Sequence, residues 1–239
     1  MERTTMTSDA VTVQIDEAVA VVRIDDGKVN ALTLDMIGAI QGALESASAG
    51  ADAVVLTGRP GCLTAGLDRS VMLGADRSVV SGNLRRVTDL YRQMMDLPVP
   101  LVVACPGHAV AAGALFLLVA DARVGARVPS RIGFNEVQIG LPLFPLAVAA
   151  ARARLAPRDF VPATIGATLY DSAGALEAGY LDEVVEPDAL LDVATERAAA
   201  LGGLDRRSYL RTRRLVVAPI LDEVERATSR RRDQAPTPG

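Results

Sequence analysis

The stretch that decides the fold runs from Pro106 to Pro145 and reads PGHAVAAGALFLLVADARVGARVPSRIGFNEVQIGLPLFP. Its run of small residues at 111–114 opens an apolar helix. Small side chains there let another group approach the first backbone N–H groups, which are free and lie at the positive end of the helix dipole. A lone acid, Glu136, follows in an apolar segment and is a candidate proton carrier. Together these features predict a site that holds a developing negative oxygen and moves a proton beside it.

Strand and helix signals alternate on both sides of this stretch, which predicts an α/β fold with a helical C-terminal part. Before it, we expect two strands within 11–24, strands at 53–57 and 101–104, and helices at 33–48 and 84–95. The helix at 84–95 has an apolar face that includes Tyr91. Gly107 is expected to lead into the central helix. After it, we expect strands at 121–124 and 181–185, helices at 142–155, 157–166, 172–178, 187–201 and 205–232, and a frayed tail from 233.

Composition narrows the possible functions of this chain. Its 239 residues suit one domain, alone or with a small appendage, and half of them are apolar. A net charge of −4, only 3% aromatic residues and no Trp argue against a nucleic-acid partner. The longest apolar run, 109–120, is too short to span a membrane, and the N-terminus has no signal-like segment, so we expect a cytoplasmic protein. Cys62 and Cys105 are predicted to be buried thiols without a disulfide.

Other common chemistries find no support in the sequence. It contains no G-x-S-x-G motif for a nucleophilic serine, and His108, its only histidine, has no evident catalytic partner. We expect His108 to be structural, with substrate contact as the less favoured alternative. No metal-ligand spacing is present, so no metal site is predicted.

Five short motifs occur in one order along the chain, and together they resemble the enoyl-CoA hydratase/isomerase (crotonase) superfamily over about residues 11–185. The resemblance implies a spiral of ββα turns over residues 1–186 and a helical region over 187–239 that mediates assembly into a homotrimer or a dimer of trimers. It also implies an acyl-CoA thioester substrate, whose enolate is held by two backbone N–H groups. Coenzyme A is then part of the substrate, and no other cofactor is expected. The motifs are VNAL (29–32), TAGLD (64–68), GHA to Asp121 (107–121), NEVQIGL (135–141) and AGYLDEVV (178–185).

The resemblance assigns roles to particular residues of this chain. It places the two enolate-binding N–H groups at Leu67 and at Ala112, where the family usually has Gly. Hydratases of the family carry one glutamate at the position of Leu115 and another at the position of Glu136. Mitochondrial Δ3,Δ2-enoyl-CoA isomerases instead combine Leu and an Asn-Glu motif, as this chain does with Leu115 and Asn135-Glu136. The expected reaction therefore moves a double bond from position 3 to position 2, with Glu136 as the only base.

Several alternatives stay open at this point. The protein could be an enoyl-CoA hydratase with altered acid–base groups, or a non-catalytic acyl-CoA binder. Glu136 could be a surface acid paired with Arg131 or Arg127. The arginines within 211–214 and 230–232 are expected on a solvated helix face, although some could meet coenzyme A phosphates, and Asp68 is expected to order its loop. The expected substrate-binding residues are Asn30, Ala31, Ala65, Gly66, Asp68, Gly113, Leu115 and Asn135.

Overall fold

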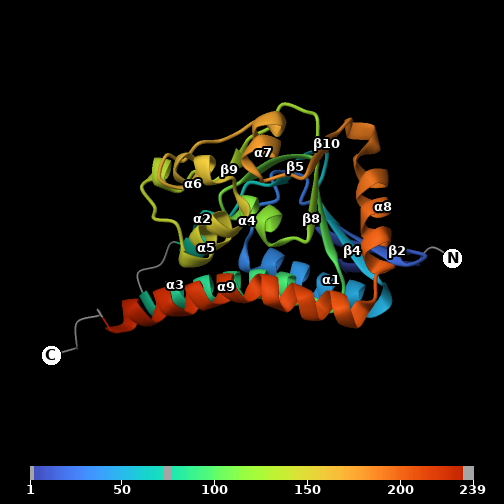
Figure 1. The fold of residues 1–239 in the computed structure, drawn as a ribbon, viewed down its shortest axis with the longest axis horizontal. Coiled ribbons are helices and arrows are strands. Elements are labelled where there is room, and N and C mark those ends of the chain that lie inside the picture. Colours follow the sequence, from blue (N-terminus) through green and yellow to red (C-terminus); the bar gives the residue numbers. More distant parts are fainter. Residues whose placement is uncertain (1–2, 73–76, 234–239) are drawn as a thin grey trace.

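The computed structural model describes residues 3–72 and 77–233, which form two sheets surrounded by helices (Figure 1). Within these residues the larger sheet has seven strands, of which the first three are antiparallel neighbours and the later ones join in parallel. The strands expected between 11 and 124 in this sheet are present. In spatial order the strands are β1 (Arg3–Ser8), β2 (Val11–Asp16), β3 (Val19–Ile24), β4 (Ala53–Thr57), β6 (Leu101–Cys105), β8 (Ala122–Ala126) and β10 (Glu183–Val185).

The smaller sheet consists, in the described part of the chain, of the parallel strands β5 (Gly61–Thr64), β7 (Gly107–Val110) and β9 (Ile132–Gly133). Each of them directly follows a strand of the larger sheet, since β4 leads to β5, β6 to β7 and β8 to β9. Helical residues then bring the chain back to the larger sheet. This repeated path is the spiral of ββα turns that the sequence resemblance implied, and the predicted fold class is confirmed.

Helices cover the sheets, and local signals explain several of their ends. The Thr33 side chain accepts a hydrogen bond from the Met36 N–H at 3.1 Å at the start of α1, and Asp171 does the same for Gly174 at 2.7 Å at the start of α7. No helix in the described ranges is long and apolar enough to cross a membrane. The helices are α1 (Leu34–Gly50), α2 (Arg69–Met72), α3 (Arg77–Met95), α4 (Ala112–Val119), α5 (Pro145–Arg154), α6 (Pro157–Thr164), α7 (Ser172–Ala178), α8 (Leu190–Gly202) and α9 (Arg206–Asp233), with the short 3-10 helices η1 (Val137–Ile139) and η2 (Pro187–Ala189).

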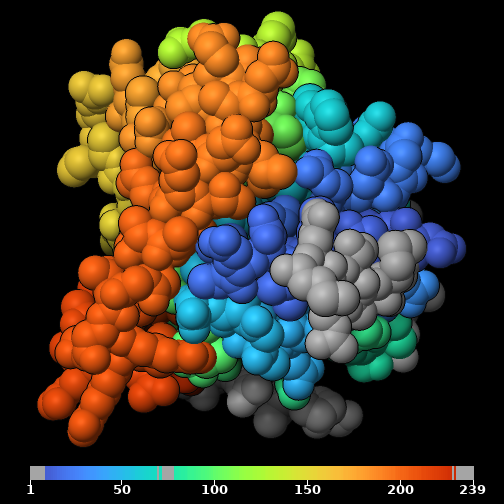
Figure 2. Space-filling model, turned by 90° about the vertical axis from the view of Figure 1, so that its right-hand side faces the viewer, coloured from blue at the N-terminus to red at the C-terminus, as the bar shows by residue number. Residues whose placement is uncertain are grey.

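The central strands of the larger sheet are buried on both faces, and their side chains alternate between two cores. In β4, Val54 and Leu56 belong to the main core, which α1, α3 and α4 complete. Ala53 and Val55 face the other way, toward Ala194 of α8. Figure 2 shows α8 over the upper left of this side of the molecule, with α9 below it. The all-apolar helix α4 lies inside the main core, where each of its eight residues is buried.

Some expected boundaries are wrong for identifiable reasons. Gly107 begins strand β7 and does not lead directly into the helix, which starts five residues later at Ala112. Helix α5 begins at Pro145, not at 142, because the residue before a proline favours extended backbone, and Phe144 has φ −79° and ψ 154°. Helix α3 begins at Arg77, earlier than expected, and α9 includes Asp233. The rest of the expected tail, 234–239, lies outside the described residues.

Candidate active site

Glu136 lies just after β9, at the start of η1, and only 8% of its surface is exposed. Its Oε2 atom is buried and has no hydrogen-bond partner among the described residues. Burial raises the pKa of this carboxyl above its ordinary value, and the backbone N–H groups of Glu136 and Asn135 offset only part of the shift. A buried carboxylate with a free oxygen and a raised pKa has the properties of a general base.

The alternative of a surface acid paired with arginine is wrong. Arg127 pairs with Glu186, with 2.9 Å between Nε and Oε1, and both side chains are exposed. Throughout the described ranges, no arginine forms an ion pair with Glu136. The negative charge of Glu136 is therefore not neutralised by a neighbouring cation, which leaves it available to accept a proton.

Two buried tyrosines lie close enough to Glu136 to be affected by its charge. Burial is the main cause that raises the pKa of both Tyr91 and Tyr180, and the charge of Glu136 adds to it in each case. Both side chains are fully buried. The Tyr91 hydroxyl donates to the Ala112 carbonyl at 2.6 Å. The surroundings of the carboxylate are thus apolar with two neutral phenols.

The segment around Leu67 is pressed against the start of α4. Gly66 has φ +92°, and a Cβ on it would lie 2.7 Å from the Val110 carbonyl oxygen and 3.2 Å from the Ala112 nitrogen. Only glycine allows the two backbones to come this close. In the part of the chain that the structure describes, the Leu67 N–H donates to no acceptor. The next N–H after Gly66 is therefore free and near the first residue of α4.

The start of α4 is held in an unusual conformation. Ala111 has φ 53° and ψ −127°, a region that favours glycine, and it immediately precedes Ala112, the first residue of the helix. The N–H of Ala111 donates to the Gly133 carbonyl at 2.9 Å, which connects this turn to β9 and the segment that carries Glu136. The N–H of Ala112 has no acceptor within the helix, because a preceding turn is missing. Strained backbone at a helix start often marks a functional site.

The first two motifs pair with each other along the backbone. The Ala65 N–H donates to the Val29 carbonyl at 2.9 Å, and the Leu32 N–H donates to the Gly66 carbonyl at 2.9 Å. Asn30 is fully buried, and its side-chain amide donates to the Ile24 and Leu63 carbonyls, at 3.0 Å in both cases. Segments about 35 positions apart in the sequence therefore form one backbone platform beside the start of α4.

Comparison with known proteins identifies the family of this chain. The family model of enoyl-CoA hydratase/isomerase matches residues 14–231. The chain belongs to the enoyl-CoA hydratase/isomerase family. An enoyl-CoA hydratase/isomerase family protein from Pseudomonas syringae has a similar structure, with 37% identity and a TM-score of 0.88, over 96% of this chain and 99% of that one.

Further relatives carry the names of two reactions. Human mitochondrial enoyl-CoA delta isomerase 1 is 29% identical over 198 residues, which are 76% of this chain and 61% of the human protein. An enoyl-CoA hydratase from Mycobacterium ulcerans Agy99 is 32% identical, with a TM-score of 0.85 over 90% of this chain and 95% of that one. Similarity thus places the chain in an enzyme family that includes both isomerases and hydratases.

The remaining predicted site residues of this family member occupy defined places. Asp68 accepts hydrogen bonds from the backbone and hydroxyl of Ser70, which lower the pKa of Asp68 and order the start of α2, as expected. Gly113 lies against Thr64, where a Cβ would come within 2.7 Å of the Thr64 carbonyl oxygen. Leu115 is fully buried in α4, one turn after Ala112. Ala31 and Asn135 are partly exposed, and their contact with substrate stays a prediction.

Other residues weighed from the sequence make contacts within the fold. The exposed His108 accepts a hydrogen bond at Nδ1 from the Arg131 N–H at 2.9 Å, which joins β7 to the segment before β9. Cys62 and Cys105 are buried free thiols, as predicted. Arg213, expected on a solvated face, is instead buried, with a side chain paired to Asp121.

Sequence reasoning missed the two tyrosines near Glu136 as parts of the site. Tyr91 was expected on the buried face of its helix, and Tyr180 stands within the motif AGYLDEVV. A buried tyrosine hydroxyl usually has a hydrogen-bond partner. A tyrosine on a predicted buried face was therefore the signal in the sequence for a polar contact inside the core. The sequence could not indicate that the partner of Tyr91 is the Ala112 carbonyl, because α3 and α4 meet only in the folded chain.

Proposed function

We propose that this protein moves the double bond of a 3-enoyl-CoA thioester to position 2, with Glu136 as the single proton carrier. The observation that carries the proposal is the state of Glu136, which is buried, free of cations and left with an unpartnered oxygen. The hydrogen bond from the Ala111 N–H to the Gly133 carbonyl, at 2.9 Å, ties its segment to the start of α4. The base and the free N–H groups thus belong to one region.

The proposed reaction transfers one proton within the substrate. Glu136 removes a proton from C2, and the electron pair of that C–H bond forms a dienolate whose negative charge rests on the thioester oxygen. The N–H groups of Leu67 and Ala112 would hold this oxygen, and each such donor stabilises the transition state by about 3 kcal/mol. The carbonyl then re-forms, the double bond settles between C2 and C3, and Glu136 returns the proton at C4. No other reactant is consumed.

Leu115 supports isomerisation over hydration. The family resemblance places a glutamate at this position in hydratases, where two carboxylates position and deprotonate water. In this chain the position holds a fully buried leucine. An alkyl side chain offers water no hydrogen bond, so a leucine at this position favours proton transfer within the substrate.

Hydration of 2-enoyl-CoA is the second candidate, favoured by the 32% identical hydratase from Mycobacterium ulcerans. Incubation with 3-enoyl-CoA and 2-enoyl-CoA of matched chain lengths separates the two reactions, when double-bond migration and water addition are followed independently. We expect a higher kcat/KM for migration. Hydration that is equally fast or faster would contradict the isomerase proposal and favour the hydratase reaction. Binding without either reaction would identify a non-catalytic acyl-CoA binder.

The role of Glu136 is tested by Glu136→Gln, which keeps the shape and removes the base. We expect kcat for double-bond migration to fall by at least about 100-fold, in line with general acid–base contributions. Glu225→Gln, on the exposed side of α9, is the matched control and should leave the rate unchanged. Near-normal turnover by Glu136→Gln on every active substrate would show that another group carries the proton.

Assembly as a homotrimer or a dimer of trimers, and a cytoplasmic location, belong to the same proposal. The family resemblance supports the assembly. It does not support the location, since the name of the human relative places that protein in mitochondria. Light scattering of the purified chain tests the assembly, since a monomer at micromolar concentration would contradict it.

A further inference from the structure

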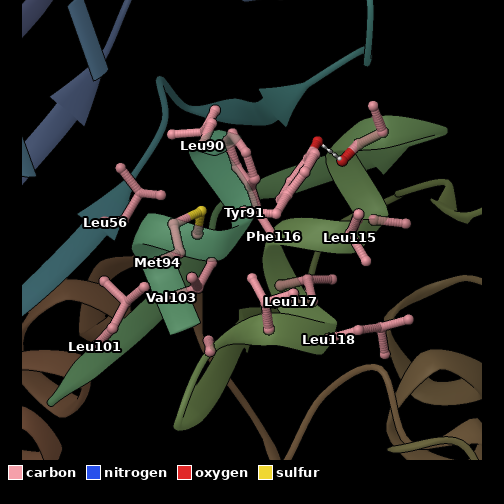
Figure 3. Packing of buried hydrophobic residues seen from close by; sticks show 14 of the residues in the cluster. Leu56, Leu90, Tyr91, Met94, Leu101, Val103, Leu115, Phe116, Leu117 and Leu118 are labelled. Carbon is pink, nitrogen blue, oxygen red and sulfur yellow. Dashed lines mark hydrogen bonds between the residues drawn. The ribbon is translucent and has the colours of Figure 1, made fainter. Parts of the chain in front are cut away.

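Tyr91 occupies an unusual place between α3 and α4. Its side chain is fully buried, and its ring lies 5.6 Å from that of Phe116 and 6.4 Å from that of Phe144, between centroids. Figure 3 shows Tyr91 packed beside Phe116 among the apolar residues of both helices. Its hydroxyl donates to the Ala112 carbonyl at 2.6 Å, at the first residue of α4. The one polar atom of this aromatic side chain is therefore directed at the start of the helix.

The bond acts on the residue that carries the proposed donor. Ala112 supplies the N–H, and its carbonyl is held by Tyr91. On the other side, the N–H of Ala111 is held by the Gly133 carbonyl at 2.9 Å. Ala111 itself has φ 53°, which an alanine keeps only when its surroundings fix it. Two hydrogen bonds thus flank the peptide between Ala111 and Ala112, which carries this N–H.

Tyr91 could instead act on Glu136, whose charge reaches it. Burial and, after it, the charge of Glu136 raise the pKa of the Tyr91 phenol, so this side chain stays neutral. The single hydroxyl proton is directed to the Ala112 carbonyl and is not available to the carboxylate. Geometry therefore favours an effect on the N–H donor over an effect on the base.

We propose that Tyr91 is a positioning residue, which holds the first turn of α4 so that the Ala112 N–H points at the substrate's thioester oxygen. This inference rests on the proposed function, because it assumes that the Ala112 N–H binds the enolate. It predicts that the hydroxyl of Tyr91 affects the reactive carbonyl without touching substrate.

Tyr91→Phe tests the inference, because it removes the hydroxyl and keeps the ring contacts. The matched control is Tyr209→Phe, whose hydroxyl bonds to Asp121 just beyond the other end of α4. We expect Tyr91→Phe to lower kcat by about 10-fold to 100-fold, part of the loss that follows removal of an oxyanion donor, with KM changed by less than about 3-fold. Tyr209→Phe should keep kcat within about 2-fold. Circular dichroism should show both variants folded.

A spectroscopic measurement separates this role from a structural one. The ¹³C resonance of a saturated acyl-CoA labelled at C1 should move downfield on binding, because hydrogen bonds polarise the carbonyl. We expect Tyr91→Phe to reduce that displacement, whereas Tyr209→Phe and Glu136→Gln should keep it. Tyr91→Phe should also leave the acidic limb of the pH profile in place, since the base is unaffected.

The outcomes distinguish the two proposals from each other. A full ¹³C displacement and a normal kcat in Tyr91→Phe, with a working wild type, would overturn the role of Tyr91 alone. If Tyr91→Phe shifts the pH at which activity falls in acid but leaves the maximal rate unchanged, Tyr91 acts through Glu136. That result would also overturn the proposed role of Tyr91. A wild type with neither carbonyl displacement nor turnover would instead contradict the proposed function.

Discussion

Glu136 combines two properties that normally exclude each other, since it is buried and it has no cation beside it. A carboxylate in such a place is costly to ionise, and burial raises its pKa. The apolar character of the segment and of Leu115, which the sequence shows, favours this direction. The sequence could not predict the unpartnered Oε2, because free and bonded oxygens depend on side chains that meet only in the folded protein.

The raised pKa of Glu136 makes the activity depend on pH. Only the ionised carboxylate accepts a proton, so kcat/KM should fall as the pH drops through the folded pKa, which lies above the ordinary value of 4.5. We expect the pH at which kcat/KM falls to half its maximum on the acidic side to lie above 4.5. The assay measures rates at saturating and subsaturating substrate concentrations across the pH range. A midpoint at or below that ordinary value would contradict the assignment.

The same shift links Glu136 to stability. Between the unfolded and the folded pKa, the folded state binds more protons than the unfolded state, so this group makes the protein less stable as the pH rises through that window. Above the window Glu136 destabilises the fold by a constant amount. Glu136→Gln should therefore raise Tm at pH 8 and give a smaller change near pH 4, measured against Glu225→Gln. An equal change at both pH values would argue against a raised pKa.

Leu115 determines, in our proposal, which reaction the site performs. Leu115→Glu would place a carboxylate one turn after Ala112, where it could hold water for hydration of 2-enoyl-CoA. It should lower stability by several kcal/mol, because an acid would be buried in an apolar position. We expect measurable hydratase activity and slower isomerisation, each followed on the same chain length. Leu115→Gln is the matched control, since it adds polarity without a base. Equal hydration rates in Leu115→Glu and Leu115→Gln would show that the added carboxylate does not cause the hydratase activity.

At the scale of elements, the larger sheet was predictable except for its first strand, β1, and the smaller sheet was not. The strands β4 and β6 are five residues long, fully buried and rich in Val and Leu. Such apolar runs can be recognised in a sequence as buried strands. Strands β5, β7 and β9 have only four, four and two residues, and Gly occurs in each. So short a segment shows no period, and only the family resemblance implied a second strand in each turn.

The close approach between the two backbones at Gly66 is an element-scale requirement that can be tested. Gly66→Ala would place its methyl group 2.7 Å from the Val110 carbonyl oxygen, at φ +92°. The start of α4 and the Leu67 segment would have to separate, so we expect a loss of about 2–4 kcal/mol in the free energy of unfolding. We also expect a large loss of kcat.

Gly42→Ala in α1 is the control for this change. Nothing lies within 4 Å of a Cβ added there, and alanine favours the helix, so the variant should be more stable by about 0.5–1 kcal/mol. Urea unfolding measures both effects. A Gly66→Ala protein with wild-type stability and activity would show that the two donors do not depend on this contact.

At the scale of the whole molecule, α9 packs on the main core through Val217, Ile220 and Val224, and a buried arginine adds polar contacts to this attachment. The side chain of Arg213 is 6% exposed, and its Nε lies 2.9 Å from Oδ1 of Asp121, just after α4. Its other nitrogens donate to the carbonyls of Met94 and Leu97 at 2.8 Å and 2.7 Å, at the end of α3. The sequence predicted a solvated face here, because an arginine among arginines shows no sign of burial. The division at residues 186 and 187 stays a prediction, and α8 and α9 both pack on the preceding residues.

Arg213→Met should therefore destabilise the entire fold. Asp121 would stay buried without its cation, and the carbonyls at the end of α3 would lose their donor, which together cost about 3–5 kcal/mol. Arg214→Met, an exposed neighbour on the same helix, should change stability by less than about 0.5 kcal/mol. Urea unfolding of both variants provides the comparison.

The pair of Arg213 and Asp121 can be separated from the other contacts by a double-mutant cycle. Burial already raises the pKa of Asp121 against the opposing pull of Arg213, so removal of the arginine raises that pKa further. Asp121→Asn should then recover part of the stability lost in Arg213→Met, because a neutral amide is less costly to bury than an unpaired carboxylate. For the same reason, Arg213→Met should lose less stability at pH 5 than at pH 8. If the two substitutions are additive and pH has no effect, the carbonyls of α3 alone hold Arg213, and the ion pair contributes nothing to the attachment of α9.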